Sequence, residues 1–336
     1  MAADQYFTIL DYEDSREQHY QMGLQARTND KLADAYSILS EDPDYRDSQE
    51  AIYQTGVSAS AEELYEVSVP CFTQVGAYKD AAMKLTMDTY AWGGQLFDNG
   101  DYDKSAEVFA SMGDFSDAPA RANEAAYAAA GEAMTNGQYD DAATRYAALG
   151  DYSDSADKAK AARYAVADEQ LESGNYAGAK ARFTALGDYS DSKSKAQECD
   201  YRPAMELFNA GNYTEAKAAF VTLGSYSNSA DMAKECDYIP AKTLYDAQQY
   251  NEALVAFNGL QGYKNSSDIM NDCRYQLGKK AMESGDYEAA RDWFDAAGDY
   301  SDAKAQTSEC RRLIALASAQ GYEQARDYEA AYGRYE

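Results

Sequence analysis

The sequence predicts an all-α protein, a solenoid of stacked helix-turn-helix repeats. The first supporting observation is a period, and the second is the helical spacing of apolar residues inside each period. An aromatic residue in an Asp- and Ser-rich turn returns along the chain at Tyr12, Tyr45, Tyr78, Phe115, Tyr152, Tyr189, Tyr226, Tyr263 and Tyr300. The first two steps are 33 residues and the remaining six are 37. A fixed period between about 20 and 50 residues is typical of a stacked repeat array.

The whole chain of 336 residues is predicted to form one solenoid. Each unit of a repeat array contacts only its neighbours, so the chain can lengthen without dividing into separate cores. The predicted organisation is a leading half-repeat 1–12, the repeats 13–45, 46–78, 79–115, 116–152, 153–189, 190–226, 227–263 and 264–300, and a truncated last repeat 301–336. Both ends cut through the pattern, so we expect a piece of a longer protein or an engineered boundary.

Each unit is predicted to contain two helices. Asp154 is expected to cap the first helix by accepting amide hydrogens of its first turn, and this helix runs to about Ser173. The equivalent positions are Asp80, Asp117, Asp191, Asn228, Asn265 and Asp302. Gly174 suits the left-handed conformation that ends a helix. A second helix, Tyr176 to Leu186, follows and ends at Gly187.

Length changes between units indicate that the variable segment is helical. From Asp154 to Tyr164 is 10 residues, whereas from Asp47 to Tyr53 is 6. In the last unit, which begins with Asp302, the first-helix stretch is four residues longer than in the middle units. Four residues add about one helical turn and nearly preserve the buried face.

Two prolines fall inside predicted first helices. Pro203 and Pro240 occupy the same position in successive units. An interior proline removes one backbone hydrogen bond and clashes with the preceding turn. These helices are therefore expected either to kink near Cys199 and Cys236 or to split in two.

The second helix carries one apolar face. Tyr176, Ala179, Phe183 and Leu186 are spaced i, i+3, i+7 and i+10, which places them on one side of a helix. The small residue suits the closest approach of two helices, and the large aromatic fills the space between units. Phe183 is therefore predicted to be buried.

These residues form a motif, Gly-x-Tyr-x-x-Ala-x-x-x-Phe-x-x-Leu, with a small residue seven positions before the Gly. That small residue is Ala130, Ala167, Ala204, Ala241 or Gly278. The motif resembles the tetratricopeptide repeat, and the resemblance covers nearly the whole chain. It implies a right-handed superhelix whose first helices line a concave groove. The chain departs from the family in its 37-residue period and in lacking a proline near the end of the second helix. This variant is similar to repeats of anaerobic Gram-positive bacteria, some of them in membrane-anchored proteins.

Charge and hydropathy restrict the function. A formal charge of −28 argues against nucleic acid, because phosphate repulsion would have to be overcome. No apolar run approaches the roughly 20 residues of a membrane helix. The N-terminus lacks the basic and apolar regions of a signal peptide. We expect a cytoplasmic protein, or the soluble part of a membrane-anchored bacterial protein.

The cysteines follow the repeat. Cys199, Cys236, Cys273 and Cys310 hold equivalent positions, which adjacent units place roughly 10 Å apart, too far for disulfides. We expect small buried hydrophobic residues. His19 is the only histidine, so no metal or other cofactor is predicted. No catalytic constellation is present, and an enzyme is not expected.

The candidate partner-binding residues lie on the first helices. The tyrosines at the edge of the apolar arc are Tyr127, Tyr164, Tyr201, Tyr238 and Tyr275. Such a tyrosine packs its ring and presents its hydroxyl to a ligand. The alternative is an aromatic core residue that repeats for structural reasons.

Acidic residues flank these tyrosines. The candidates among them are Asp168, Glu172, Glu198, Glu235 and Asp246. The basic residues expected on the same face are only Arg202, Lys242 and Lys279. This balance predicts a basic, Lys- or Arg-bearing partner segment. The alternative is a charged surface that serves solubility.

The predicted function is a scaffold that binds a protein or peptide in the concave, acidic, tyrosine-edged groove. The second hypothesis is a structural spacer or a self-assembling array that associates through its uncapped ends. A stable foreign partner would favour the first, and concentration-dependent oligomers the second.

Overall fold

The structure is a computed structural model, and it describes residues 13–260, 262–324 and 332–334. All regular secondary structure in these ranges is helical, which confirms the all-α prediction. The predicted half-repeat 1–12 lies outside the described residues, as does much of the predicted second helix of the last repeat. The chain divides into two compact units, residues 1–166 and 167–336, and the division falls within α10 (Ser155–Glu172).

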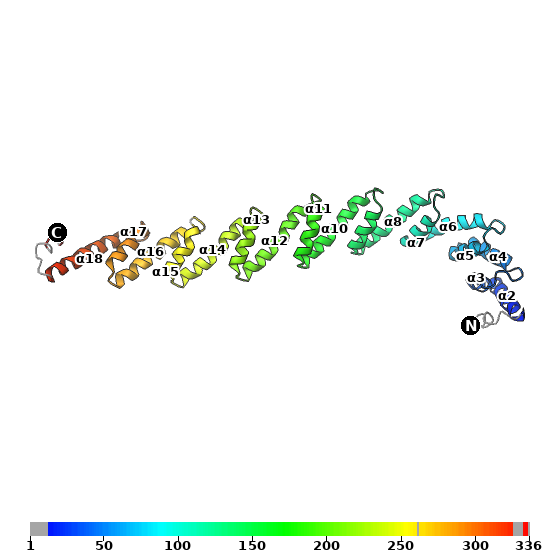
Figure 1. Cartoon of the computed structure of the whole chain (residues 1–336), viewed down its shortest axis with the longest axis horizontal. Coiled ribbons are helices and arrows are strands. Elements are labelled where there is room, and N and C mark those ends of the chain that lie inside the picture. The colour runs from blue at the N-terminus through cyan, green and yellow to red at the C-terminus, as the bar shows by residue number, and fades with distance from the viewer. Residues whose placement is uncertain (1–12, 261, 325–331, 335–336) are drawn as a thin grey trace. The chain divides into compact units, whose positions relative to one another are not determined.

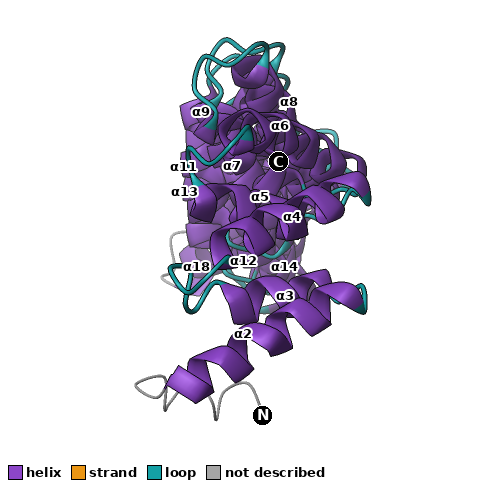
Figure 2. Ribbon diagram, turned by 90° about the vertical axis from the view of Figure 1, so that its right-hand side faces the viewer, coloured by secondary structure: helices purple, strands orange, loops and turns teal. Residues whose placement is uncertain are grey.

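The first unit is a series of helical hairpins. Its helices before α10 are α2 (Glu13–Thr28), α3 (Leu32–Leu39), α4 (Ser48–Ala61), α5 (Tyr65–Val75), α6 (Ala81–Asp98), α7 (Tyr102–Ser111), α8 (Ala118–Thr135) and α9 (Tyr139–Ala148). From α2 to α9, consecutive helices pack against each other (Figure 1). Short loops join the helices, as Figure 2 shows for α2 and α3.

The second unit repeats the same arrangement. After α10 come α11 (Tyr176–Leu186), α12 (Ser192–Asn209), α13 (Tyr213–Leu223), α14 (Ser229–Asp246), α15 (Tyr250–Phe257), the 3-10 helix η1 (Asn258–Leu260), α16 (Ser266–Glu283), α17 (Tyr287–Ala297) and α18 (Ala303–Gln324). From α11 to α18, consecutive α-helices pack against each other. First helices begin at Ser192, Ser229 and Ser266, which are 37 residues apart. Packing between chain neighbours is the defining property of an α-solenoid.

Helix lengths confirm that the variable segment is helical. The first helix has 14 residues in α4, 18 in α6 and 22 in α18. Each step is four residues, about one turn, so the buried face is nearly kept. Pro203 and Pro240 lie inside α12 and α14, each a single helix of 18 residues. Of the two outcomes expected at these prolines, a split helix does not occur.

Glycines end the helices as predicted. Gly174 follows α10 with φ +82°, and Gly187 follows α11 with φ +59°. These values lie in the left-handed region, which costs glycine nothing because it has no Cβ. The chain therefore turns sharply after each helix and begins the next one within a few residues.

The core repeats with the sequence. Phe183 and Ala179 are fully buried, as predicted, and the small residue Ala167 is buried too. In the last complete unit the small residue is Gly278, where an added Cβ would meet the Phe294 ring at 2.8 Å. All five cysteines are buried free thiols, which confirms their predicted role. No helix in the described ranges combines the length and apolar character needed to cross a bilayer.

Candidate partner-binding face

The first-helix tyrosines pack between two other aromatic residues of their own unit. Tyr201 on α12 is half-buried, and its ring centroid lies 5.8 Å from Phe220 on α13 and 5.8 Å from the turn residue Tyr226. Both contacts are edge-to-face, the arrangement that aromatic rings favour. Tyr127, Tyr238 and Tyr275 pack in the same way. Tyr164 lies on α10 and is half-buried.

The hydroxyls of these tyrosines reach the next unit. The Tyr201 hydroxyl donates to Asn228 Oδ1 at 2.6 Å, and Tyr238 donates to Asn265 Oδ1 at 2.5 Å. Two other tyrosines make the same bond to an aspartate. Tyr127 donates to Asp154 at 2.5 Å, and Tyr275 donates to Asp302 at 2.5 Å. Each acceptor directly precedes the next first helix. The bond therefore joins two successive first helices.

This bond corrects the predicted role of the acceptor side chains. Asn228 and Asn265 stand at the N-cap position, as expected, but their side chains accept no hydrogen bond from the backbone of the helix they precede. The same is true of Asp80 and Asp117, which accept the hydroxyls of Tyr53 and Tyr90. The side chain of the repeated Asp or Asn instead accepts a hydrogen bond from the tyrosine hydroxyl of the preceding first helix.

The hydrogen bonds from the tyrosine hydroxyls also shift the pKa values of both partners. The bond from Tyr53 holds the pKa of Asp80 below its ordinary value, and it raises the pKa of Tyr53 to about 12. The bond from Tyr275 lowers the pKa of Asp302 in the same way. A hydrogen bond to the charged form of a carboxyl group favours that form. These carboxylates are therefore held ionised.

These contacts favour the structural alternative for the tyrosines. Tyr127, Tyr201, Tyr238 and Tyr275 each have their ring packed in the core and their hydroxyl donated within the array. A ligand would have to displace that bond to use the hydroxyl. The groups on this face that a partner could contact are therefore the neighbouring carboxylates.

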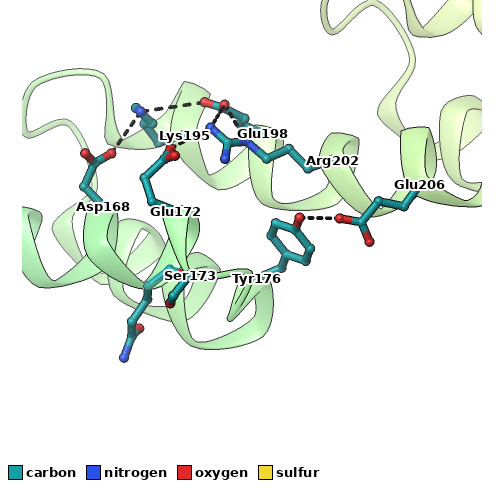
Figure 3. Close-up of polar contacts among 9 residues, drawn as sticks. Asp168, Glu172, Ser173, Tyr176, Lys195, Glu198, Arg202 and Glu206 are labelled. Atoms are coloured by element: carbon teal, nitrogen blue, oxygen red, sulfur yellow. Dashed lines mark hydrogen bonds and ion pairs between the residues drawn. The ribbon is translucent and has the colours of Figure 1, made fainter.

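Three candidate carboxylates lie between α10 and α12, where Figure 3 shows them pointing toward two cations. Lys195 Nζ lies 2.9 Å from Asp168 Oδ1 and 3.8 Å from Glu198 Oε2. Arg202 Nη2 lies 2.8 Å from Glu172 Oε1 and also 2.8 Å from Glu198 Oε1. These pairs join two successive first helices of the second unit.

The two remaining acidic candidates are also paired. Glu235 accepts hydrogen bonds from the Tyr263 hydroxyl at 2.8 Å and from Lys264 Nζ at 2.6 Å. Its side chain is only 19% exposed, so its role is to hold the turn. Asp246 pairs with Lys242 one turn before it on α14. Its side chain is 58% exposed and remains open to a partner.

Sequence reasoning missed two of the cations on this face. Lys195 and Lys264 were not among the expected basic residues, because Lys195 lies in the first turn of α12 and Lys264 lies in a turn between helices. The signal that could have found them is the period. Lys195 is 27 residues after Asp168, the same separation that joins Tyr201 to Asn228. Residues about 27 to 29 positions apart lie across the junction between units.

The electrostatics of this face are therefore more balanced than predicted. Asp168, Glu172 and Glu198 face Lys195 and Arg202, three carboxylates against two cations. The hydrogen bonds that Arg202 donates to Glu172 and Glu198 raise the pKa of Arg202 above its usual value, and the bond that Lys195 donates to Asp168 raises the pKa of Lys195. In the described part of the chain, no three His, Cys, Asp or Glu side chains form a group that could hold a metal ion.

Comparisons with known proteins give solved structures only. No family model and no curated protein matches the sequence. The TPR domain of P58(IPK) is 15% identical, covers 89% of this chain and 98% of its own, and has a TM-score of 0.19. A monomeric mutant of IFIT1 with Gppp-AAAA is 13% identical, covers 95% of this chain and 78% of its own, and has a TM-score of 0.17. At these scores the likeness carries no argument about the site, and the Gram-positive resemblance stays a prediction.

Proposed function

We propose that this protein is a scaffold that binds a protein or peptide, and that a basic partner segment contacts the face of Asp168, Glu172 and Glu198. The observation that carries the proposal is a row of carboxylates, joined across two first helices by ion pairs and still open to solvent. The Glu172 side chain is 61% exposed and that of Asp168 is 41% exposed. Asp246 adds an exposed carboxylate on α14.

The ion pairs on this face can be exchanged at little cost. An exposed pair contributes about 0–1 kcal/mol at most, because water and salt screen it. A partner Lys or Arg can therefore replace Lys195 or Arg202 beside these carboxylates. Three carboxylates against two cations leave one negative charge for the partner to balance. Complementary charge mainly speeds the encounter, so salt should slow association.

The test is binding of a fluorescently labelled lysine-rich peptide, followed by anisotropy at low and high salt. The variant is Asp168→Asn, Glu172→Gln and Glu198→Gln together. The matched control is the triple variant Glu215→Gln, Glu252→Gln and Glu288→Gln, which removes the same charge from exposed second-helix positions.

The first triple variant should weaken binding several-fold and flatten its salt dependence, and the control should change it little. If both triple variants weakened peptide binding equally, the loss would reflect the overall charge of the protein, and the proposed face would be wrong. Light scattering over a range of concentrations tests the self-assembling alternative. The uncapped ends on which that alternative rests lie largely outside the described residues.

A further inference from the structure

A hollow of about 350 Å³ opens between successive second helices of the second unit. It is lined by Leu254, Val255, Asn258, Met270, Arg274 and Trp293. The helices α15 and α17 form its sides, and α16 contributes Met270 and Arg274. A volume of a few hundred Å³ with mostly apolar lining is typical of a small binding pocket.

The repeat builds the same hollow in the first unit, between α5, α6 and α7. That hollow has about 470 Å³. Val69 there occupies the position of Leu254, each three residues before the buried second-helix phenylalanine. Thr89 occupies the position of Arg274, each nine residues after the Asp or Asn that precedes the first helix. The two tryptophans of the chain, Trp92 and Trp293, line one hollow each. The hollow follows from the stacking, and of these two hollows the one in the second unit carries an arginine at this position.

Arg274 is a cation without an anion. Its Nη1 donates to Asn271 Oδ1 at 2.7 Å, and no carboxylate in the described ranges forms an ion pair with it. By contrast, Arg145 and Arg202 each pair with two carboxylates. The chain carries a formal charge of −28, so carboxylates are abundant. A half-buried guanidinium in an apolar hollow retains most of its donors for an incoming oxygen anion.

We propose that this hollow binds an acidic side chain of a partner peptide, with the carboxylate on Arg274 and a flanking apolar residue against Trp293. The guanidinium fork matches a carboxylate through two parallel hydrogen bonds. Val255 at the rim is 79% exposed, so the apolar lining continues onto open surface and suits a passing segment. The hollow and the carboxylate-bearing face therefore select partner segments of opposite charge.

The test uses the full chain and the indole N–H signals of its two tryptophans in NMR spectra. The probes are an acetylated and amidated Leu-Glu-Phe-Leu peptide and its Leu-Gln-Phe-Leu counterpart. The variants are Arg274→Gln and Arg274→Lys, and the control is Arg312→Gln on the exposed surface of α18. Trp92 reports on the hollow that lacks an arginine.

The Glu peptide should shift the Trp293 signal, and the Gln peptide should bind about tenfold more weakly because a charge-assisted contact is lost. Arg274→Gln should abolish the preference for Glu, Arg274→Lys should keep part of it, and Arg312→Gln should leave it intact. Trp92 should not distinguish the two peptides. An unmoved Trp293 signal at millimolar Glu peptide would overturn the proposal, as would equal binding of both peptides. The lysine-rich peptide tests a different face, so either proposal can fail alone.

Discussion

At the scale of single residues, the first-helix tyrosine is an internal link. Its ring packs in the core of its own unit, and its hydroxyl donates to the residue that precedes the next first helix. The sequence placed these tyrosines at the edge of the apolar arc but left their role open. A helical wheel describes faces within one helix, whereas this bond spans 27 residues and depends on how units stack.

Replacing Tyr201 with Phe should test this link. The change keeps the ring and removes the bond to Asn228, so it should destabilise the α12–α14 region by about 0.5–1.5 kcal/mol. Hydrogen exchange of the α14 amides would measure the loss. Tyr332→Phe is the control, since the Tyr332 side chain is 69% exposed. Exchange in α14 that does not respond to Tyr201→Phe would show that the hydroxyl adds nothing to stacking.

The aspartate-linked units should respond to acid differently from the asparagine-linked ones. Hydrogen bonds from Tyr53, Tyr90 and Tyr275 lower the pKa values of their partner carboxyls below the ordinary value. A lowered folded-state pKa gives stability that is present above the unfolded value, near 3.9, and is lost as pH falls through the folded value.

The expected result is therefore acid loosening at the junctions made by Asp80, Asp117 and Asp302. The junctions made by Asn228 and Asn265 should lack this contribution, because an amide does not titrate there. Hydrogen exchange at the starts of α6 and α14, compared from neutral pH down to about pH 3, would separate the two kinds. Asp80→Asn should remove the acid response at α6. Identical acid responses at both kinds of junction would rule out this source of pH dependence.

At the scale of helices, most boundaries could be predicted. The helix α11 spans Tyr176–Leu186, as expected, and α10 ends at Glu172, next to the expected Ser173. The glycines that follow the helices and the spacing of the apolar residues determine these helix ends from local sequence alone. The outcome at Pro203 could not be predicted, because the lost hydrogen bond competes with packing against other helices. The 3-10 turn η1 after α15 was not foreseen either, since no residue type there demands it.

The repeated aromatic of the second helix should dominate local stability. Phe183 is fully buried, so Phe183→Ala should cost about 3–5 kcal/mol through lost burial and an internal cavity. Coupling in an array runs between neighbours, so hydrogen exchange should rise in α11 and α12 before α17. Val221→Ala on α13 is the control, because Val221 is 62% exposed and should cost little. A Phe183→Ala protein that loosens evenly throughout its second unit would contradict nearest-neighbour coupling.

At the scale of the whole molecule, the repeat architecture followed from the period, but the charge pattern of the face did not. The sequence analysis set five acidic candidates against three cations because it counted groove positions within one helix at a time. In the structure Lys195 and Lys264 reach that face from neighbouring segments and neutralise part of it. The repeat limits, the continuity of one array over residues 1–336 and its right-handed sense stay predictions, as do the partner and the cellular location.

The most direct test of the proposed function is hydrogen exchange of the full chain with and without the lysine-rich peptide. Protection is expected on α10, α12 and α14, near Asp168, Glu172, Glu198 and Asp246, and it should fade at high salt. The second helices α11 and α13 should be unchanged. Protection on α11 and α13 in place of the first helices, or no protection at saturating peptide, would contradict a partner-binding face on the first helices.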